Sequence, residues 1–196
     1  MQALYFCATI LTILILVIGI VIGLIRKKSV SKAVKILRSV IFTYVLLWIV
    51  FYYKRGVTAT NFGEDICFDD WCATVISYEK LEKIGYQNSS GQFIILTVQM
   101  TNKARGISQK PSEPRVHIID DKGNSWGTTT VGQKALEDLQ GQQVPLDQRL
   151  ELNQSLQTKL VFDMPKTATD LKAFIEEGPF ITNCLLQEDK KVFPLK

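Results

Sequence analysis

Residues 93–102 read FIILTVQMTN, and this stretch decides the fold. Successive side chains alternate between the two sides of an extended chain. One side of this stretch therefore carries only apolar side chains: Ile94, Leu96, Val98 and Met100. The other side carries Ile95 followed by polar residues at 97, 99 and 101. This pattern predicts a β-strand with one face in a hydrophobic core and one face closer to solvent.

Further short runs of β-branched and apolar residues lie on both sides of this strand. They are separated by Gly, Pro, Asn and Asp residues and occupy 72–78, 115–119, 158–162, 171–175 and 192–195. Together they indicate about seven or eight strands. No regular helix alternates with them, so we expect an all-β, antiparallel β-sandwich. One short helix is predicted at Lys134–Leu139, between Gly132 and Gly141.

Two long apolar runs precede this domain. Residues 4–25 carry no charge, and residues 36–53 carry one, Arg38. At about 1.5 Å per residue, the first run spans roughly 33 Å, enough for a hydrocarbon core of about 30 Å. We therefore expect a transmembrane helical hairpin over residues 1–55. A polar tether at 56–63 and a β-sandwich domain at 64–196 complete the predicted organisation.

Basic residues between the apolar runs and at the start of the second run predict the orientation in the membrane. They are Arg26, Lys27, Lys28, Lys32, Lys35 and Arg38. Cytoplasmic loops are enriched in Lys and Arg, so we expect this loop inside, both termini outside, and the protein in the cell membrane. The alternatives are the inverted topology and a cleaved signal peptide. A signal peptide is disfavoured because residues 1–3 include no basic side chain.

The formal net charge of +4 combines two regions of opposite character. Eight of the 23 Lys and Arg residues lie before residue 56, so fifteen remain against all 19 Asp and Glu residues. The outer domain thus carries a net charge of about −4, which argues against a nucleic-acid partner. Basic residues beside a bilayer attract anionic headgroups by about 1 kcal/mol each. Fixing the orientation is a sufficient explanation for the basic loop.

Cys67 and Cys72 bracket the sequence FDDW. If Asp69 and Asp70 form a two-residue turn, the cysteines face each other across a hairpin, within reach of a disulfide. The oxidising compartment outside the cytoplasm favours this bond. Two free thiols, or pairing of either cysteine with Cys184, are the alternatives. The spacing lacks the C-x-x-C geometry of redox catalysts.

Two acidic pairs raise the question of a metal site. Asp69, Asp70, Asp120 and Asp121 are candidate calcium ligands, because hard cations prefer carboxylate oxygens. Their spacing does not fit an EF-hand, and Asp followed by Gly and Asn is typical of a hairpin turn. His117 is the only histidine, so a zinc site is poorly supported, and we expect its side chain on the solvent face.

Trp71 and Trp126 lie beside predicted hairpin turns. Burial between the sheets is the favoured interpretation for both, because a sandwich commonly buries a Trp there. An exposed Trp would instead be the best candidate to anchor a partner. Arg149, in a predicted loop, is a third candidate for partner binding.

Four phrases follow one another in the outer domain: ICFDDWCATV (66–75), GQFIILTVQMTNKARG (91–106), VHIIDDKG (116–123) and LVFDMPK (160–166). Their order resembles bacterial membrane-anchored, immunoglobulin-like (telokin-like) domains of unknown function. Those domains are similar to a secreted mycobacterial antigen and to immunoglobulin-like protease inhibitors. The resemblance covers about residues 63–195, although the family's frequent Pro-Gly is replaced here by Leu152-Asn153. It implies an immunoglobulin-like sandwich outside the cytoplasm and no catalytic residues.

These observations favour a non-catalytic, membrane-tethered module that binds another envelope protein or an extracellular ligand. The chain has no nucleophile elbow and no Gly-rich phosphate loop, so we expect neither an enzyme nor a cofactor. The alternative is a domain that inhibits a protease or modulates an enzyme. That function requires an exposed, rigid loop, for which Lys134–Leu150, with Gly141, Pro145 and Arg149, is the longest candidate.

Overall fold

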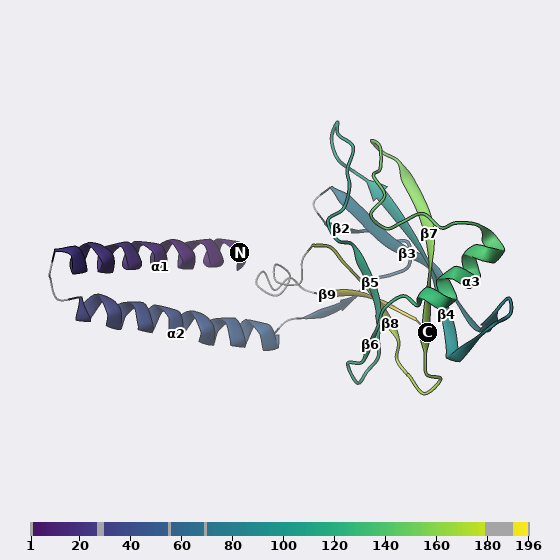
Figure 1. Cartoon of the computed structure of the whole chain (residues 1–196), viewed down its shortest axis with the longest axis horizontal. Coiled ribbons are helices and arrows are strands. Elements are labelled where there is room, and N and C mark those ends of the chain that lie inside the picture. Colours follow the sequence, from purple (N-terminus) through teal and green to yellow (C-terminus); the bar gives the residue numbers. More distant parts are fainter. Residues whose placement is uncertain (1, 27–29, 55, 69, 179–189, 196) are drawn as a thin grey trace. The chain divides into compact units, whose positions relative to one another are not determined.

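A computed structural model describes residues 2–26, 30–54, 56–68, 70–178 and 190–195. The chain divides into two compact units, a pair of helices and a β-sandwich that begins at Val57 (Figure 1).

The first unit contains helix α1 (Gln2–Ile25) and helix α2 (Ser31–Lys54). Both are long and apolar enough to cross a membrane. Mean hydropathy is 3.0 over Ala8–Ile25 and 1.9 over Ser31–Val50, and no residue in either window is buried. A helix from the core of a soluble domain would bury an apolar stripe, whereas these helices expose apolar side chains.

Helix α2 begins earlier than predicted from hydropathy. It starts at Ser31, so Lys32 and Lys35, which we expected in the loop, lie in its first turns. Lys and Arg are good helix formers, so the helix extends beyond the apolar run. Arg26 follows α1, and Lys27 and Lys28 lie outside the described residues.

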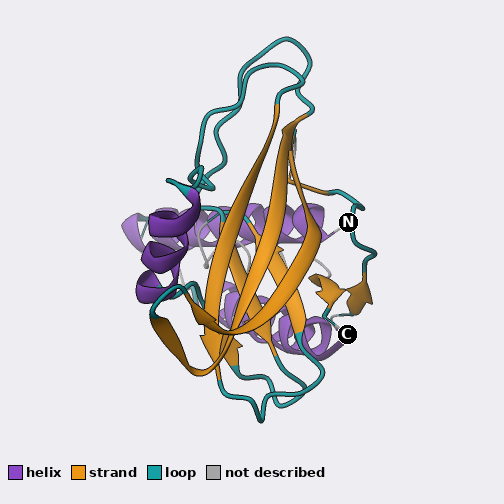
Figure 2. Ribbon diagram, turned by 90° about the vertical axis from the view of Figure 1, so that its right-hand side faces the viewer, coloured by secondary structure: helices purple, strands orange, loops and turns teal. Residues whose placement is uncertain are grey.

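The second unit is a sandwich of two β-sheets (Figure 2). One sheet has the strand order β2-β3-β4-β7, with bounds Ile66–Phe68, Trp71–Ile84, Gln87–Asn102 and Ser155–Met164. The other has the order β1-β9-β8-β5-β6, with bounds Val57–Ala59, Lys190–Pro194, Lys172–Glu176, Arg115–Ile119 and Ser125–Trp126. The described residues thus form nine strands rather than the predicted seven or eight.

Strand β1 corrects two predictions. It lies inside the segment 56–63 that we predicted to be a tether, so the sandwich begins closer to α2 than expected. It also pairs in parallel with β9, with Val57 opposite Lys190, whereas every other strand pairing in the described residues is antiparallel. The partner of this three-residue strand lies more than 130 positions later in the chain, so no pattern in the neighbouring sequence predicts the pairing.

The predicted alternation in β4 is confirmed, and its inner face forms the main core. Ile94, Leu96, Val98 and Met100 are each 0% exposed. They pack between the sheets with side chains from β3, β5, β7, β8 and β9. The outer face is less exposed than predicted, because Phe93 and Ile95 are also buried.

Helix α3 (Thr130–Gln140) is the reason for this additional burial. Leu136 packs with Phe93, Ile95 and Val161 in a second hydrophobic cluster, on the outer face of the four-stranded sheet. Figures 1 and 2 show the helix beside these strands. Leu136 is 1% exposed, so the helix contributes directly to the stability of the sheet.

Gly132 explains why α3 is longer than the predicted Lys134–Leu139. We interpreted this glycine as the boundary of the helix, because glycine disfavours helix interiors. In the structure Gly132 is buried within α3, and a Cβ atom there would lie 2.7 Å from Cγ1 of Val161. The close approach of helix and strand therefore requires glycine inside the helix.

Two glutamine side chains cover the outer edge of β7. The amide of Gln133 donates to the carbonyl of Lys159 at 2.9 Å and accepts from the backbone N–H of Val161 at 3.0 Å. Gln143 accepts from the N–H of Lys159 at 3.2 Å. These bonds replace those that a neighbouring strand would make.

We predict that Leu136→Ala destabilises the protein by about 2–5 kcal/mol, because it leaves a cavity between α3 and the sheet. Leu139→Ala is the matched control, since Leu139 lies on the same helix but is 61% exposed. It should change the free energy of unfolding by less than about 1 kcal/mol. Guanidinium denaturation of the full chain in detergent, followed by tryptophan fluorescence, measures both. Equal effects would contradict the packing described for α3.

Candidate functional site

The predicted disulfide is present. Cys67 lies directly opposite Cys72 in the β2–β3 hairpin, and their sulfur atoms are bonded. Asp70 belongs to the turn between them, and Asp69 lies outside the described residues. Cys184 also lies outside the described residues, and neither bonded cysteine is available to it. The bond fixes a short loop from which Phe68, Asp70 and Trp71 project.

Trp71 is a core residue that also lines a surface cleft. It is 2% exposed, which confirms the favoured interpretation of burial and makes an exposed anchor wrong for this residue. Its ring lies 5.7 Å from that of Phe68, measured between centroids, at an angle of 33°. Its indole nitrogen is buried and has no hydrogen-bond partner among the described residues.

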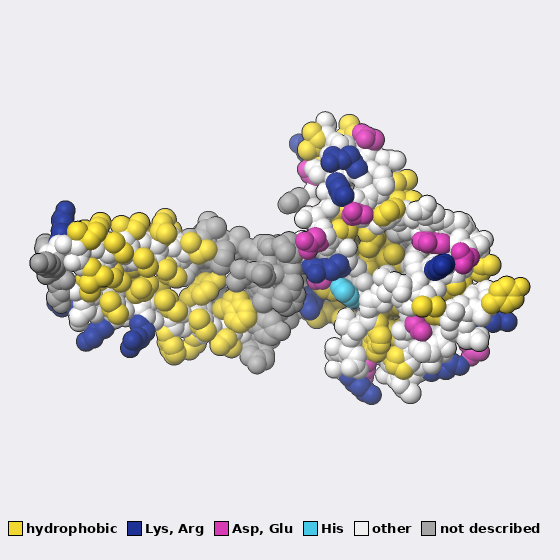
Figure 3. Space-filling model, in the orientation of Figure 1, with side chains coloured by type: hydrophobic (Ala, Val, Ile, Leu, Met, Phe, Trp, Pro, Cys, Tyr) yellow, Lys and Arg dark blue, Asp and Glu magenta, His cyan; other side chains and the backbone are white. Residues whose placement is uncertain are grey.

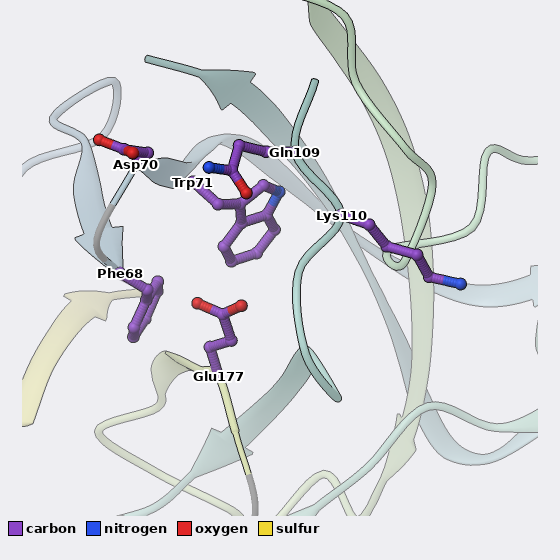
Figure 4. Close-up of a pocket in the computed structure, with 6 residues that line it drawn as sticks. All are labelled: Phe68, Asp70, Trp71, Gln109, Lys110 and Glu177. Atoms are coloured by element: carbon purple, nitrogen blue, oxygen red, sulfur yellow. The ribbon is translucent and has the colours of Figure 1, made fainter. Parts of the chain in front are cut away.

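The cleft lies between the disulfide hairpin and two segments that are distant in sequence. It has a volume of about 520 Å³ and is lined by Phe68, Asp70, Trp71, Gln109, Lys110 and Glu177. Figure 4 shows the carboxylate of Glu177 directed toward the two aromatic rings, with the side chain of Gln109 beside the indole of Trp71. The two aromatic rings and the carboxylate of Glu177 therefore face one hollow, whereas the charged ends of Asp70 and Lys110 point away from it.

Glu177 is held in place by the backbone of the segment that also carries Gln109 and Lys110. The N–H of Ser112 donates to Oε1 of Glu177 at 2.6 Å. A hydrogen bond from a fixed backbone group to a carboxylate restricts its orientation. The N–H of Ser112 thus fixes the direction in which the carboxylate of Glu177 points.

Asn102, at the end of β4, holds the segment that forms the other wall. It is 0% exposed, and its amide nitrogen donates to the carbonyls of Ile107 and Leu150, each at 3.0 Å. Its side-chain oxygen accepts from the N–H of Ala104 at 2.8 Å. Leu150 in turn forms an isolated β-bridge with Gln109, a residue of the cleft. One buried amide therefore connects β4 to both loops behind the cleft.

The other two candidates for partner binding differ in position. Arg149 is exposed, and its Nη1 donates to Oγ of Ser108 at 3.1 Å, next to the cleft residue Gln109. Trp126, on β6, is partly buried against the main core and does not line the cleft. It is therefore not an exposed anchor.

The predicted long loop Lys134–Leu150 is not present as such. Its first part belongs to α3, and its last residue, Leu150, is fully buried. Between them Gln143 bonds to β7, as described above. The loop that motivated the inhibitor alternative is therefore shorter and more firmly attached than predicted.

The acidic pairs do not form a metal centre in the described part of the chain. Asp120 is buried, and its carboxylate accepts from the N–H groups of Lys122 and Asn124, at 3.0 and 2.8 Å, and from Nδ2 of Asn124 at 2.7 Å. Burial raises the pKa of Asp120, but these hydrogen bonds outweigh it, so the pKa lies below its usual value. Asp121 is exposed. No group of three His, Cys, Asp or Glu in the described residues is arranged to hold a metal ion.

His117 lies on the outer face of the five-stranded sheet, as expected. Its Nε2 is 3.5 Å from Oε1 of Glu176, and Nε of Arg115 is 3.3 Å from the same oxygen. Figure 3 shows the histidine, in cyan, beside basic side chains. The hydrogen bond with His117 lowers the pKa of Glu176 against the opposing effect of burial, and the charge of Arg115 lowers it further.

Of the residues that line the cleft, sequence reasoning named Trp71 as a candidate for partner binding and Asp70 as a candidate metal ligand, and it did not predict the cleft itself. Gln109, Lys110 and Glu177 have no motif around them, and they meet only after both sheets have formed. The available signal was the proximity of Phe68, Asp70 and Trp71 to the disulfide.

Comparisons with known proteins find similar structures only. No protein-family model matches the chain, and no curated protein matches it. A conserved hypothetical protein from Bacillus anthracis is 18% identical, covers 69% of this chain and 94% of its own, and has a TM-score of 0.48. An uncharacterized β-sandwich protein from Clostridium difficile is 15% identical, covers 72% of this chain and 96% of its own, and has a TM-score of 0.45. The secreted protein MPT63 from Mycobacterium tuberculosis is 13% identical, covers 70% of this chain and 96% of its own, and has a TM-score of 0.48. These values assign no function.

We predict that Asn102→Ala destabilises the protein by about 2–4 kcal/mol, because the N–H of Ala104 and the carbonyls of Ile107 and Leu150 each lose a hydrogen bond to this amide. Asn88→Ala, at an exposed position of the same strand, should stay within about 0.5 kcal/mol of the wild type. Amide hydrogen exchange should also show faster exchange at Ala104 in Asn102→Ala. Unchanged protection there would contradict the role of Asn102 in holding the loop.

Proposed function

We propose that this protein is a non-catalytic binding module of the cell envelope, tethered to the membrane by α1 and α2. In this proposal the sandwich is immunoglobulin-like, lies outside the cytoplasm, and contacts another envelope protein through the cleft. The single observation that supports the membrane location most strongly is the exposure of apolar side chains on both helices.

Three further features support the orientation. The basic residues gather where the two helices meet in the sequence, because Arg26 follows α1 and Lys32, Lys35 and Arg38 lie in the first turns of α2, as expected for a cytoplasmic end. The disulfide fits an oxidising compartment. The sandwich begins only three positions after α2 ends, so the cleft belongs to a domain held near the bilayer surface.

The cleft supports binding better than catalysis. It combines two aromatic side chains with charged groups at its rim, a composition typical of protein recognition sites. The described residues that line it include no histidine, cysteine or serine that could act as a nucleophile. We therefore assign the cleft to a partner and not to a reaction.

Thiol labelling of intact cells tests the location. After reduction, a membrane-impermeant maleimide should label Cys67, which is exposed, whereas Cys72 is fully buried and should react only after unfolding. Without reduction neither should react. A cysteine introduced at Ser31, at the start of α2, is the control and should react only after lysis. Labelling of Cys67 that also requires lysis would contradict the proposed orientation.

Photo-crosslinking in intact cells tests the binding site. A photoreactive amino acid at Lys110, at the cleft, should give a discrete adduct with an envelope protein. The same amino acid at Lys122, exposed in the β5–β6 turn, is the matched control and should not give this adduct. Identical adducts at both positions, or none at Lys110, would count against the cleft as the binding site.

A further inference from the structure

We infer that the bond between Cys67 and Cys72 is a redox switch for the cleft. A dithiol of another envelope protein reduces this bond, and reduction releases the wall of the cleft that carries Phe68. The inference rests on the proposed function and specifies how its site is regulated. It follows from the position of the bond in the sheet, from the unequal exposure of the two cysteines and from the residues that lie between them.

The disulfide lies outside the main core. In the β2–β3 hairpin, Ile66 is opposite Ala73 and Cys67 is opposite Cys72. Ile66 and Ala73 belong to the core between the sheets. Because side chains alternate along a strand, the bonded cysteines lie on the outer face of the four-stranded sheet. A reductant therefore reaches the bond without entering the core.

The two cysteines differ in their access to solvent. Cys67 is exposed, whereas Cys72 is 0% exposed. An external thiolate can attack only Sγ of Cys67, so Cys72 is the leaving group. Exposed disulfides are the ones that exchange with thiols most readily, and regulatory disulfides belong to this class. The geometry therefore fixes both the point and the direction of attack.

The reaction is a thiol–disulfide exchange in two steps. The thiolate of the reductant forms a bond to Sγ of Cys67, the bond to Cys72 breaks, and the Cys72 thiolate takes up a proton. The second thiol of the reductant then attacks the mixed disulfide and releases Cys67 as a thiol. Two electrons and two protons pass to this protein, and the dithiol of the partner becomes a disulfide.

Reduction moves the side of the hairpin that lines the cleft. Two thiol sulfur atoms that are no longer bonded must separate to van der Waals contact. Cys72 is enclosed in β3, which pairs with a strand on each side, whereas Cys67 lies in the three-residue edge strand β2. Cys67 therefore moves. Phe68 follows it directly and shares a wall of the cleft with Trp71.

The rest of the sandwich does not need the bond. The cysteines are 5 positions apart, and the entropic contribution of a disulfide is smallest for so short a loop. Strand β3 remains attached through Trp71, Ala73 and Val75 in the main core and through its pairing with β4. The reduced domain therefore stays folded, and the change is confined to β2 and the turn that follows it.

The rate of reduction of the full chain in detergent tests the access to the bond. The probe is dithiothreitol. Samples are quenched with acid and labelled with a maleimide in guanidinium, and the mass of the peptide that contains Cys67 and Cys72 counts the reduced cysteines. The native chain should react within about a hundredfold of the rate in guanidinium. Reduction that required global unfolding would be slower by more than about a thousandfold, and this result would overturn the inference.

Amide hydrogen exchange locates the change. After reduction, the peptide that contains Ile66–Phe68 should exchange at least about tenfold faster, whereas the central part of β4 should keep its protection. Cys67→Ser, at an exposed position that puts folding at little risk, should show this pattern without reductant. Ser77→Ala, at an exposed position of β3, is the matched control and should exchange like the wild type. Equal exchange at Ile66–Phe68 in the oxidised and reduced chains would contradict the movement of β2.

The photoreactive amino acid at Lys110 connects the switch to the cleft. In isolated membranes, the adduct with the partner should decrease severalfold after reduction. In Cys67→Ser it should be weak both with and without dithiothreitol. An adduct that survives reduction unchanged would overturn the regulation of the cleft. No adduct even before reduction would contradict the proposed function instead, and the reduction rate and the hydrogen exchange would still decide whether the disulfide is a switch.

Discussion

Strand β4 is packed on both of its faces, and the rest of the domain depends on this constraint. Its inner face provides Ile94, Leu96, Val98 and Met100 to the main core, and its outer face provides Phe93 and Ile95 to the cluster under α3. A shift of the strand by one residue would exchange these faces and expose both cores. The pairing of β4 with β3 and with β7 is therefore strongly specified, and the remaining strands are placed around it.

The cleft depends on the end of this strand. Asn102 is the last residue of β4, and its amide holds the segments that carry Gln109 and Leu150. The opposite wall is fixed independently by the disulfide between β2 and β3. Two separate restraints, one hydrogen-bonded and one covalent, thus bring the aromatic and acidic sides of the cleft together.

Sequence predicted correctly those parts of the structure that local sequence patterns determine. The alternation in β4 identified its inner face, residues 115–119 became β5 without change, and the FDDW turn placed Cys67 opposite Cys72. The errors within the sandwich came from long-range contacts. Strand β1 was interpreted as a tether because its partner lies at the far end of the chain.

Long-range contacts also explain the two remaining errors. Gly132 was interpreted as a helix boundary because only the proximity of Val161 shows why glycine is needed there. Most of the candidate site was missed for the same reason: Gln109 and Glu177 acquire a role only through folding.

The hydrogen bonds of Gln133 at the edge of β7 have a further consequence. An unpaired edge strand is a template for another chain. With the amide of Gln133 in place of a neighbouring strand, β7 is closed to strand addition at Lys159 and Val161. At those positions a second copy of the domain cannot extend the sheet, so two molecules that meet there keep their sheets separate.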